Sequence, residues 1–233
     1  MVVKKAEESI RNTAKWRQEN GVASLIEESF PEGWLETMPI YIDAVTPDGV
    51  LIVTIEAGLI DFLGMLNKFG RKKTVLLFMQ AFSQIEQVLI DLNRKNLGDE
   101  PLTENSVIGA IILIDMDQFA VRQLRSIEGI QAITEICQNL VKYFPYVSSM
   151  FMFINCNIVT SALFKIVRPI LESPSLKFEV YGQNKSEWQG RVSNFAPENL
   201  LRTPFGGTKP KENIIKRRKM VDRSQILSMN TIK

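Results

Sequence analysis

Two aspartates separated by one residue, Asp115 and Asp117, form the pattern in the sequence best suited to covalent chemistry. They directly follow the apolar run from Val107 to Ile114, whose β-branched residues predict a buried strand. A strand end lies at the open edge of a parallel sheet, where one carboxylate can act as a nucleophile and its neighbour as an acid or base. A structural role is the alternative, because aspartate also commonly caps the helix that follows a strand.

The surroundings of this pair argue against catalysis. A haloacid-dehalogenase-like phosphotransferase using Asp115 and Asp117 would have a small or β-branched residue where this chain has Phe119. No downstream acidic pair with a supporting lysine stands out in the sequence. Two glycine-containing segments, 70–74 and 206–208, lack the glycine spacing or flanking elements of phosphate loops, and we interpret both as turns. We predict that the chain is not an enzyme and keep the phosphotransferase as an alternative.

Histidine is absent from the 233 residues, and this limits the possible chemistry further. Its absence excludes nucleophiles activated by histidine, imidazole bases and histidine-containing zinc sites. The two cysteines, Cys137 and Cys156, fall within apolar segments, so we expect buried reduced thiols. We therefore predict no catalytic residue, no cofactor and no metal site.

Positive charge is concentrated at the C-terminal end. Residues 209–233 have a net charge of +6, whereas the first 208 residues have a net charge of −4. Four basic residues are consecutive: Lys216, Arg217, Arg218 and Lys219. Near an anionic membrane each basic residue contributes about 1 kcal/mol of attraction, so we expect these four to contact a membrane surface. We expect no nucleic-acid partner, and the alternative is a solvated tail that binds nothing.

Hydropathy predicts a soluble protein. The N-terminus has charges where a secretory signal needs apolar residues, and no uninterrupted apolar run approaches the roughly 18 residues of a spanning helix. With 45% hydrophobic residues the chain has enough apolar volume for a packed core. We expect a cytoplasmic protein that associates with membranes peripherally.

Apolar periodicity predicts an α/β fold with a mainly parallel sheet, because strands alternate with helices. The expected elements are a helix over 3–19, a strand hairpin over 38–45 and 50–57, a helix over 75–95, a strand over 107–114, a helix that uses Ile130 to Val141, a strand over 150–155, a helix over 157–171 and a strand over 177–182.

The predicted helix over 157–171 has an unusual composition. Apolar residues form a broad face, while Phe164 shares the other side with Lys165 and Arg168. Such a helix favours apolar surroundings almost all round, and the mixture of Phe164 with basic residues is typical of helices that lie in a membrane interface. We therefore expect Phe164, Lys165 and Arg168 to contact a membrane. The alternative is an ordinary core helix.

Several dispersed segments together resemble the CRAL-TRIO family of lipid-binding domains. The main one, residues 151–182, reads FMFINCNIVTSALFKIVRPILESPSLKFEVYG. Residues 12–21 resemble the last N-terminal helix of the family, and Ile112 to Asp115 its central strand. Residues 197–200 (PENL) and 206–208 (GGT) resemble its closing signature. The resemblance covers roughly residues 10 to 208, without most of the family's N-terminal helical module.

This resemblance implies a sheet with flanking helices that enclose a hydrophobic lipid cavity, over which the helix at 157–171 acts as a mobile gate. The expected division is a remnant N-terminal helix (1–21), a lipid-binding domain (22–208) and a basic tail (209–233). Ala162 and Ile166 are expected to point beneath the gate. The expected lipid-binding residues are Phe151, Phe153, Ile158, Ala162, Ile166, Ile170 and Lys177.

The function that the resemblance implies is the binding of one hydrophobic lipid and its transfer between membranes or to a partner. The cargo would be a phospholipid, an isoprenoid or a tocopherol-like lipid. Burying an apolar chain contributes about 0.8 kcal/mol per methylene and needs no catalytic group. A domain that has lost its cargo and serves as an interaction scaffold is the remaining alternative.

Overall fold

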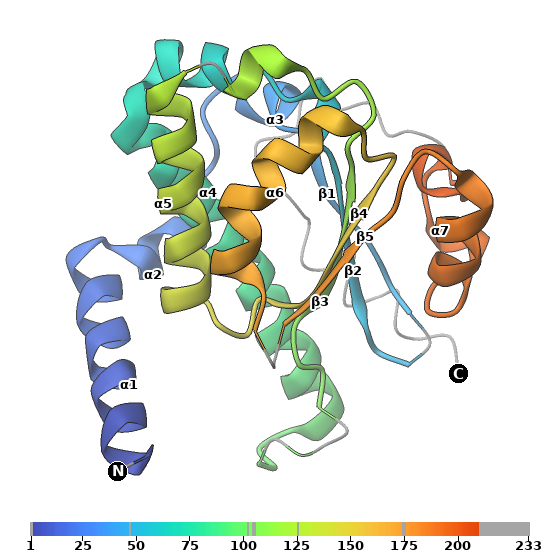
Figure 1. The fold of residues 1–233 in the computed structure, drawn as a ribbon. Helices are drawn as coiled ribbons and strands as arrows, with labels where there is room; N and C mark the ends of the chain where they lie inside the picture. The colour runs from blue at the N-terminus through green and yellow to red at the C-terminus, as the bar shows by residue number, and fades with distance from the viewer. Residues whose placement is uncertain are drawn as a thin grey trace.

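The computed structural model of the protein describes residues 2–46, 48–101, 103, 106–124, 126–173 and 176–209. These residues form an α/β fold in which helices cover both faces of a five-stranded sheet (Figure 1). The strands are β1 (Ile40–Val45), β2 (Leu51–Glu56), β3 (Ala110–Asp115), β4 (Ser148–Ile154) and β5 (Lys177–Val180). The α-helices are α1 (Val2–Glu19), α2 (Val22–Leu25), α3 (Trp34–Thr37), α4 (Phe62–Leu97), α5 (Ile127–Tyr143), α6 (Ile158–Leu171) and α7 (Lys185–Ser193), and the 3-10 helices are η1 (Ala57–Leu59), η2 (Val121–Leu124), η3 (Glu198–Leu200) and η4 (Thr203–Phe205).

The strands lie in the order in which they occur in the sequence, and the predicted α/β class is confirmed. β1 and β2 are antiparallel, as predicted for a hairpin, and their turn is closed by the hydrogen bond from Gly49 N to Thr46 O (2.8 Å). All later neighbours are parallel, because a helix returns the chain to the same edge of the sheet between successive strands.

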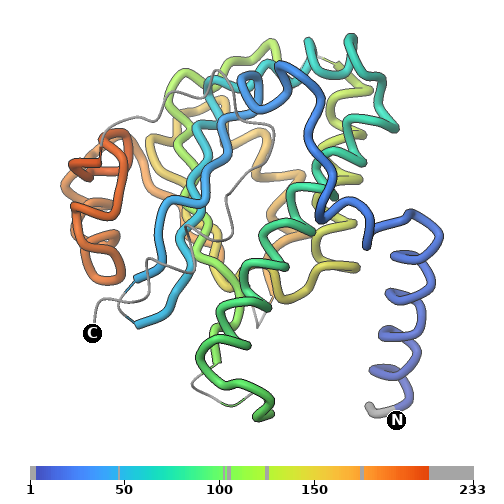
Figure 2. Tube along the Cα trace, turned by 180° about the vertical axis from the view of Figure 1, so that it is seen from behind, coloured from blue at the N-terminus to red at the C-terminus, as the bar shows by residue number. Residues whose placement is uncertain are grey.

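The central parallel strands, β3 and β4, are buried on both sides. Ile112 of β3 and Phe153 of β4 contribute to the core shared with α4, α5 and α6, whereas Leu113 and Met152 belong to a second core with Trp188 of α7. Figure 2, seen from behind, shows α7 set apart from the other helices across the sheet. Because neither face is solvated, β3 and β4 have no alternation of apolar and polar residues.

Helix α4 begins thirteen residues before the predicted start at residue 75, so that prediction was wrong at its N-terminal end. The helix bends at Gly70, whose φ of 74° and ψ of 160° are not helical, so the segment interpreted as a turn is a kink within a longer helix. Among the described residues, α4 alone is long and apolar enough to cross a membrane. However, 67% of its most apolar window is buried inside the protein, as expected for a core helix.

The two ends of the described chain attach differently. Helix α1 projects from the body (Figures 1 and 2) and is held near its C-terminal end, where Trp16 stacks on Tyr143 of α5 with ring centroids 3.9 Å apart. Helix α7 was not predicted. Its nine residues bury Trp188 and Val192, which is too few apolar residues to form a recognisable stripe.

Candidate functional site

Four phenylalanines gather between α6 and the sheet. Phe151 and Phe153 on β4 have ring centroids 6.2 Å apart, and Phe153 lies 4.8 Å from Phe178 on β5. Phe164 on α6 contacts both strands, with its ring centroid 4.9 Å from Phe153 and 5.7 Å from Phe178. We call these four residues the phenylalanine cluster. Edge-on and tilted contacts at such distances are favourable arrangements for aromatic rings.

The position of α6 is set by its N-terminal cap. The Asn157 side chain accepts hydrogen bonds from the backbone N–H groups of Val159 (2.9 Å) and Thr160 (3.2 Å). The buried face of the helix then consists of Thr160, Leu163, Val167 and Leu171. The outer face begins at Ile158, which is 89% exposed, and continues through the exposed residues Ser161, Ala162, Lys165, Arg168 and Pro169.

This arrangement corrects the predicted orientation of α6. Ile158 and Ala162 point away from the phenylalanine cluster, Ile166 and Ile170 are half-buried, and Phe164 points inward although it was expected on the exposed side. The reason is that apolar residues cover well over half the circumference of the helix. Periodicity alone could not determine which part of such a wide apolar arc faces the sheet. Whether these side chains contact a lipid stays a prediction.

Lys177 lies away from the other expected lipid-binding residues. It neighbours Met150 in the sheet, and Met150 belongs to the core on the α7 side. Since alternate residues of a strand point to opposite faces, Lys177 and Phe178 lie on opposite faces of β5. Of the seven residues expected to bind lipid, Phe151 and Phe153 are the two that belong to the phenylalanine cluster.

The basic residues expected to contact a membrane fall into two groups. Lys165 and Arg168 are exposed on α6, where Arg168 Nε donates to Glu172 (2.9 Å) and the guanidinium carbon lies 5.4 Å from the Phe178 ring centroid. Lys216, Arg217, Arg218 and Lys219 lie outside the described residues.

Asp115 joins the ends of two neighbouring strands. Its Oδ1 accepts hydrogen bonds from Asn155 Nδ2 (2.8 Å) and from the backbone N–H of Asp117 (3.0 Å). Burial raises the pKa of the Asp115 carboxyl, although these hydrogen bonds partly oppose the increase. The side chain borders an open polar cavity of about 390 Å³, which Glu56 and Asp117 also line. Among the described residues, no group of three or more acidic or cysteine side chains could hold a metal ion.

The two cysteines have no disulfide partner among the described residues. Burial raises the pKa of the Cys137 thiol to about 12 and that of the Cys156 thiol to about 11. Neither thiol is therefore ionised at neutral pH, so neither is activated as a nucleophile.

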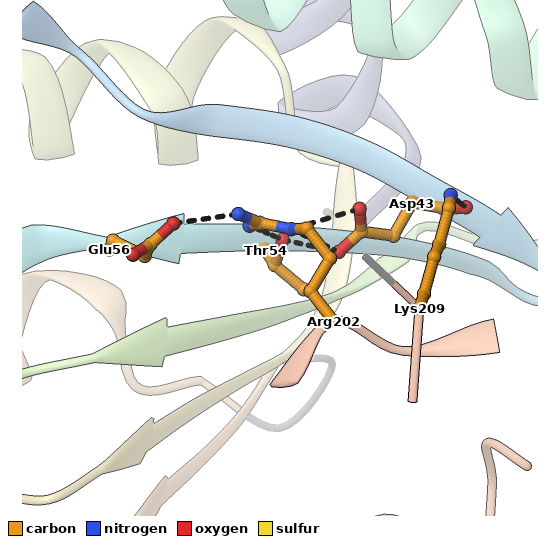
Figure 3. A network of polar contacts seen from close by, with 5 residues as sticks. All are labelled: Asp43, Thr54, Glu56, Arg202 and Lys209. Atoms are coloured by element: carbon orange, nitrogen blue, oxygen red, sulfur yellow. Dashed lines mark hydrogen bonds and ion pairs between the residues drawn. The ribbon is translucent and has the colours of Figure 1, made fainter. Parts of the chain in front are cut away.

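A buried ionic network, which the sequence did not reveal, fastens the C-terminal segment to the first two strands (Figure 3). Arg202 is fully buried, and its guanidinium donates to Asp43 of β1 (3.2 Å), to Glu56 of β2 (2.6 Å) and to the Thr54 hydroxyl. The Tyr41 ring centroid lies 3.5 Å from its guanidinium carbon. These partners are about 150 positions distant along the chain, so no local pattern could indicate the pairing.

The predicted turn at 206–208 completes this attachment. Gly206 has a φ of 82°, and a Cβ at Gly207 would lie 1.9 Å from the Leu201 carbonyl oxygen. Close approach of the two backbones therefore requires glycine at position 207.

Comparisons with known proteins agree with this architecture. The model of the CRAL/TRIO domain family matches residues 35–207. Among solved structures, the crystal structure of Sfh5 is similar with a TM-score of 0.57 and 14% sequence identity, over 91% of this chain and 68% of that chain. At this identity the likeness concerns the fold alone. A comparison with curated proteins gave no match.

Proposed function

Because the chain belongs to the CRAL/TRIO domain family, we propose that it binds one hydrophobic lipid beneath α6 and transfers it between membranes or to a partner. CRAL/TRIO domains are lipid-binding domains in general. The phosphotransferase alternative has no support from the comparisons, and the hydrogen bonds of Asp115 are those of a residue that joins two strand ends.

The observation that carries the proposal is that α6 has apolar residues on both its inner and its outer face. Leu163 and Val167 pack toward the sheet, whereas Ile158 and Ala162 meet solvent. Exposed apolar side chains such as Ile158 are unfavourable in water, and beside the exposed Lys165 and Arg168 they are favourable in a membrane interface. Because α6 has apolar residues on both sides, it can leave the core and bind a membrane instead. This movement would uncover the phenylalanine cluster.

The chemistry of the cluster favours an apolar cargo. Four aromatic rings provide van der Waals contact, and each methylene of an acyl or isoprenoid chain buried against them contributes about 0.8 kcal/mol. A phospholipid, an isoprenoid or a tocopherol-like lipid meets this requirement through its apolar part. We further propose that the protein is cytoplasmic, is not an enzyme, and docks peripherally through α6.

Extraction of the purified protein followed by mass spectrometry tests the proposal. We expect one lipid per protein molecule, and we expect the delipidated protein to accelerate transfer of that lipid between two vesicle populations. The absence of any bound lipid, together with no transfer of a phospholipid, a retinoid or a tocopherol, would contradict lipid binding. That result would favour the interaction scaffold, a domain without cargo in which the four rings simply pack against one another.

A further inference from the structure

Phe164 differs from the other members of the phenylalanine cluster in its origin. Phe151, Phe153 and Phe178 belong to the sheet, while Phe164 reaches them from α6. Its ring meets Phe153 at an interplanar angle of 67° and Phe178 at 90°. The ring therefore inserts edge-on against the sheet surface that a cargo beneath α6 would have to contact.

The space between α6 and the sheet cannot hold both the Phe164 ring and a lipid chain, because protein interiors are already packed at the density of organic crystals. The three sheet rings are held by strands that pair with each other in the sheet, and their side chains are buried. Phe164 lies on a helix whose other face is exposed, so Phe164 is the member of the cluster that can leave.

We propose that Phe164 is a stopper: in the lipid-free protein its ring occupies the place that a single acyl or isoprenoid chain takes in the loaded protein. This inference rests on the proposed function and names the residue that controls entry. The stopper substitutes for cargo, so that the sheet rings are not exposed to water when the protein is empty. A lipid chain enters only if its own contacts with Phe153 and Phe178 replace the contacts that the Phe164 ring makes with them. This requirement selects apolar lipid chains.

The experiment measures uptake of cis-parinaric acid, a single-chain lipid whose fluorescence rises in apolar surroundings, by delipidated full-length protein in a stopped-flow instrument. The test variant is Phe164→Ala. The matched control is Phe82→Ala, because Phe82 is also half-buried and makes an edge-on contact, with its ring centroid 5.8 Å from Phe144, but lies on α4 away from the phenylalanine cluster. Melting temperatures confirm that each variant is folded.

We expect Phe164→Ala to take up the probe about tenfold faster than the wild type, which corresponds to a closed state weakened by about 1.4 kcal/mol. Phe82→Ala should keep the wild-type rate at a similar loss of melting temperature. If Phe164→Ala does not fold, Phe164→Leu is the test variant instead, and it should take up the probe faster than the wild type.

An unchanged or slower rate in the folded Phe164 variant, or no binding of the probe by any variant, overturns the stopper. The proposed function fails separately, through the absence of lipid in extracts of the wild-type protein and of vesicle transfer. A wild type that carries lipid, with a Phe164 variant that behaves like the Phe82 control, would leave Phe164 as ordinary core packing.

Discussion

Arg202 carries a charge that is fully buried, which is unfavourable unless other groups compensate for it. A buried guanidinium is tolerated only when its charge is neutralised and its nitrogens find hydrogen-bond acceptors. Here the carboxylates of Asp43 and Glu56 supply the negative charge, and the Thr54 hydroxyl accepts a further hydrogen bond. The Tyr41 ring covers one side of the guanidinium. The network joins the C-terminal segment to the antiparallel pair at the edge of the sheet. Its members therefore depend on each other far more than surface ion pairs do.

Replacing Arg202 with methionine should lower the free energy of unfolding by about 3 to 5 kcal/mol, because two carboxylates would remain buried without a cation. Arg191→Met is the matched control. Arg191 forms a two-pronged ion pair with Glu179 that is one-quarter to one-third exposed, so its loss should cost about 1 kcal/mol. Urea unfolding of both variants measures the difference, and equal losses would contradict the importance of burial.

Asp115 leads to a prediction about pH. Its pKa is raised in the folded protein, so the fold favours the protonated carboxyl and has a cost at neutral pH that disappears as the pH falls below its ordinary value near 3.8. Asp115→Asn keeps an oxygen that accepts from Asn155 and removes the charge. The variant should melt at the same or a higher temperature than the wild type at pH 7, and the difference should vanish near pH 3. A variant clearly less stable than the wild type at pH 7 would show that the carboxylate itself is required.

Among the secondary-structure elements, the strands were the most predictable. The run 50–57 is rich in β-branched residues and bounded by turn residues, and it contains β2. The run 107–114 predicted β3 less exactly, because the strand begins three residues later, at Ala110, and ends at Asp115. The orientation of α6 was not predictable, because its apolar residues cover an arc wider than the buried face and some of them, such as Ile158 and Ala162, meet solvent beside Lys165 and Arg168. Arg202 and α7 were missed for a related reason: their burial depends on partners distant in sequence rather than on a local pattern.

The outer face of α6 gives a direct test of membrane docking. Ile158 is 89% exposed, so Ile158→Asp should leave the melting temperature unchanged. Transfer of this side chain into a membrane would contribute about 1.5 to 3 kcal/mol, so the variant should bind phosphatidylcholine liposomes at least about tenfold more weakly. Ile10→Asp on α1 is the control, since Ile10 is 70% exposed and lies on another helix. Equal binding by both variants and the wild type would count against docking through α6.

For the molecule as a whole, charge is distributed unevenly between the body and residues 209–233. The boundary between them should fall after Lys209, because its backbone N–H donates to Leu201 O (2.9 Å) and its Nζ donates to Asp43 O (2.8 Å). Lys209 is thus part of the attachment around Arg202. A truncation that removes it would confuse loss of stability with loss of charge.

Truncation after Lys209 should therefore leave the melting temperature and the amount of bound lipid unchanged, and should weaken binding to anionic liposomes at low salt. The removed segment contains Lys216, Arg217, Arg218 and Lys219 in succession, whose attraction to an anionic surface can reach a few kcal/mol. The difference in binding between full-length and truncated protein should decrease as salt is added, since the Debye length falls from about 10 Å at 0.1 M to about 3 Å at 1 M.

Sedimentation with phosphatidylserine-containing liposomes at both salt concentrations measures this difference in binding. Phosphatidylcholine liposomes serve as the control, because docking there depends on the apolar face of α6 and not on the tail. Equal binding of the two proteins to the anionic liposomes at low salt would mean that the tail is a solvated end.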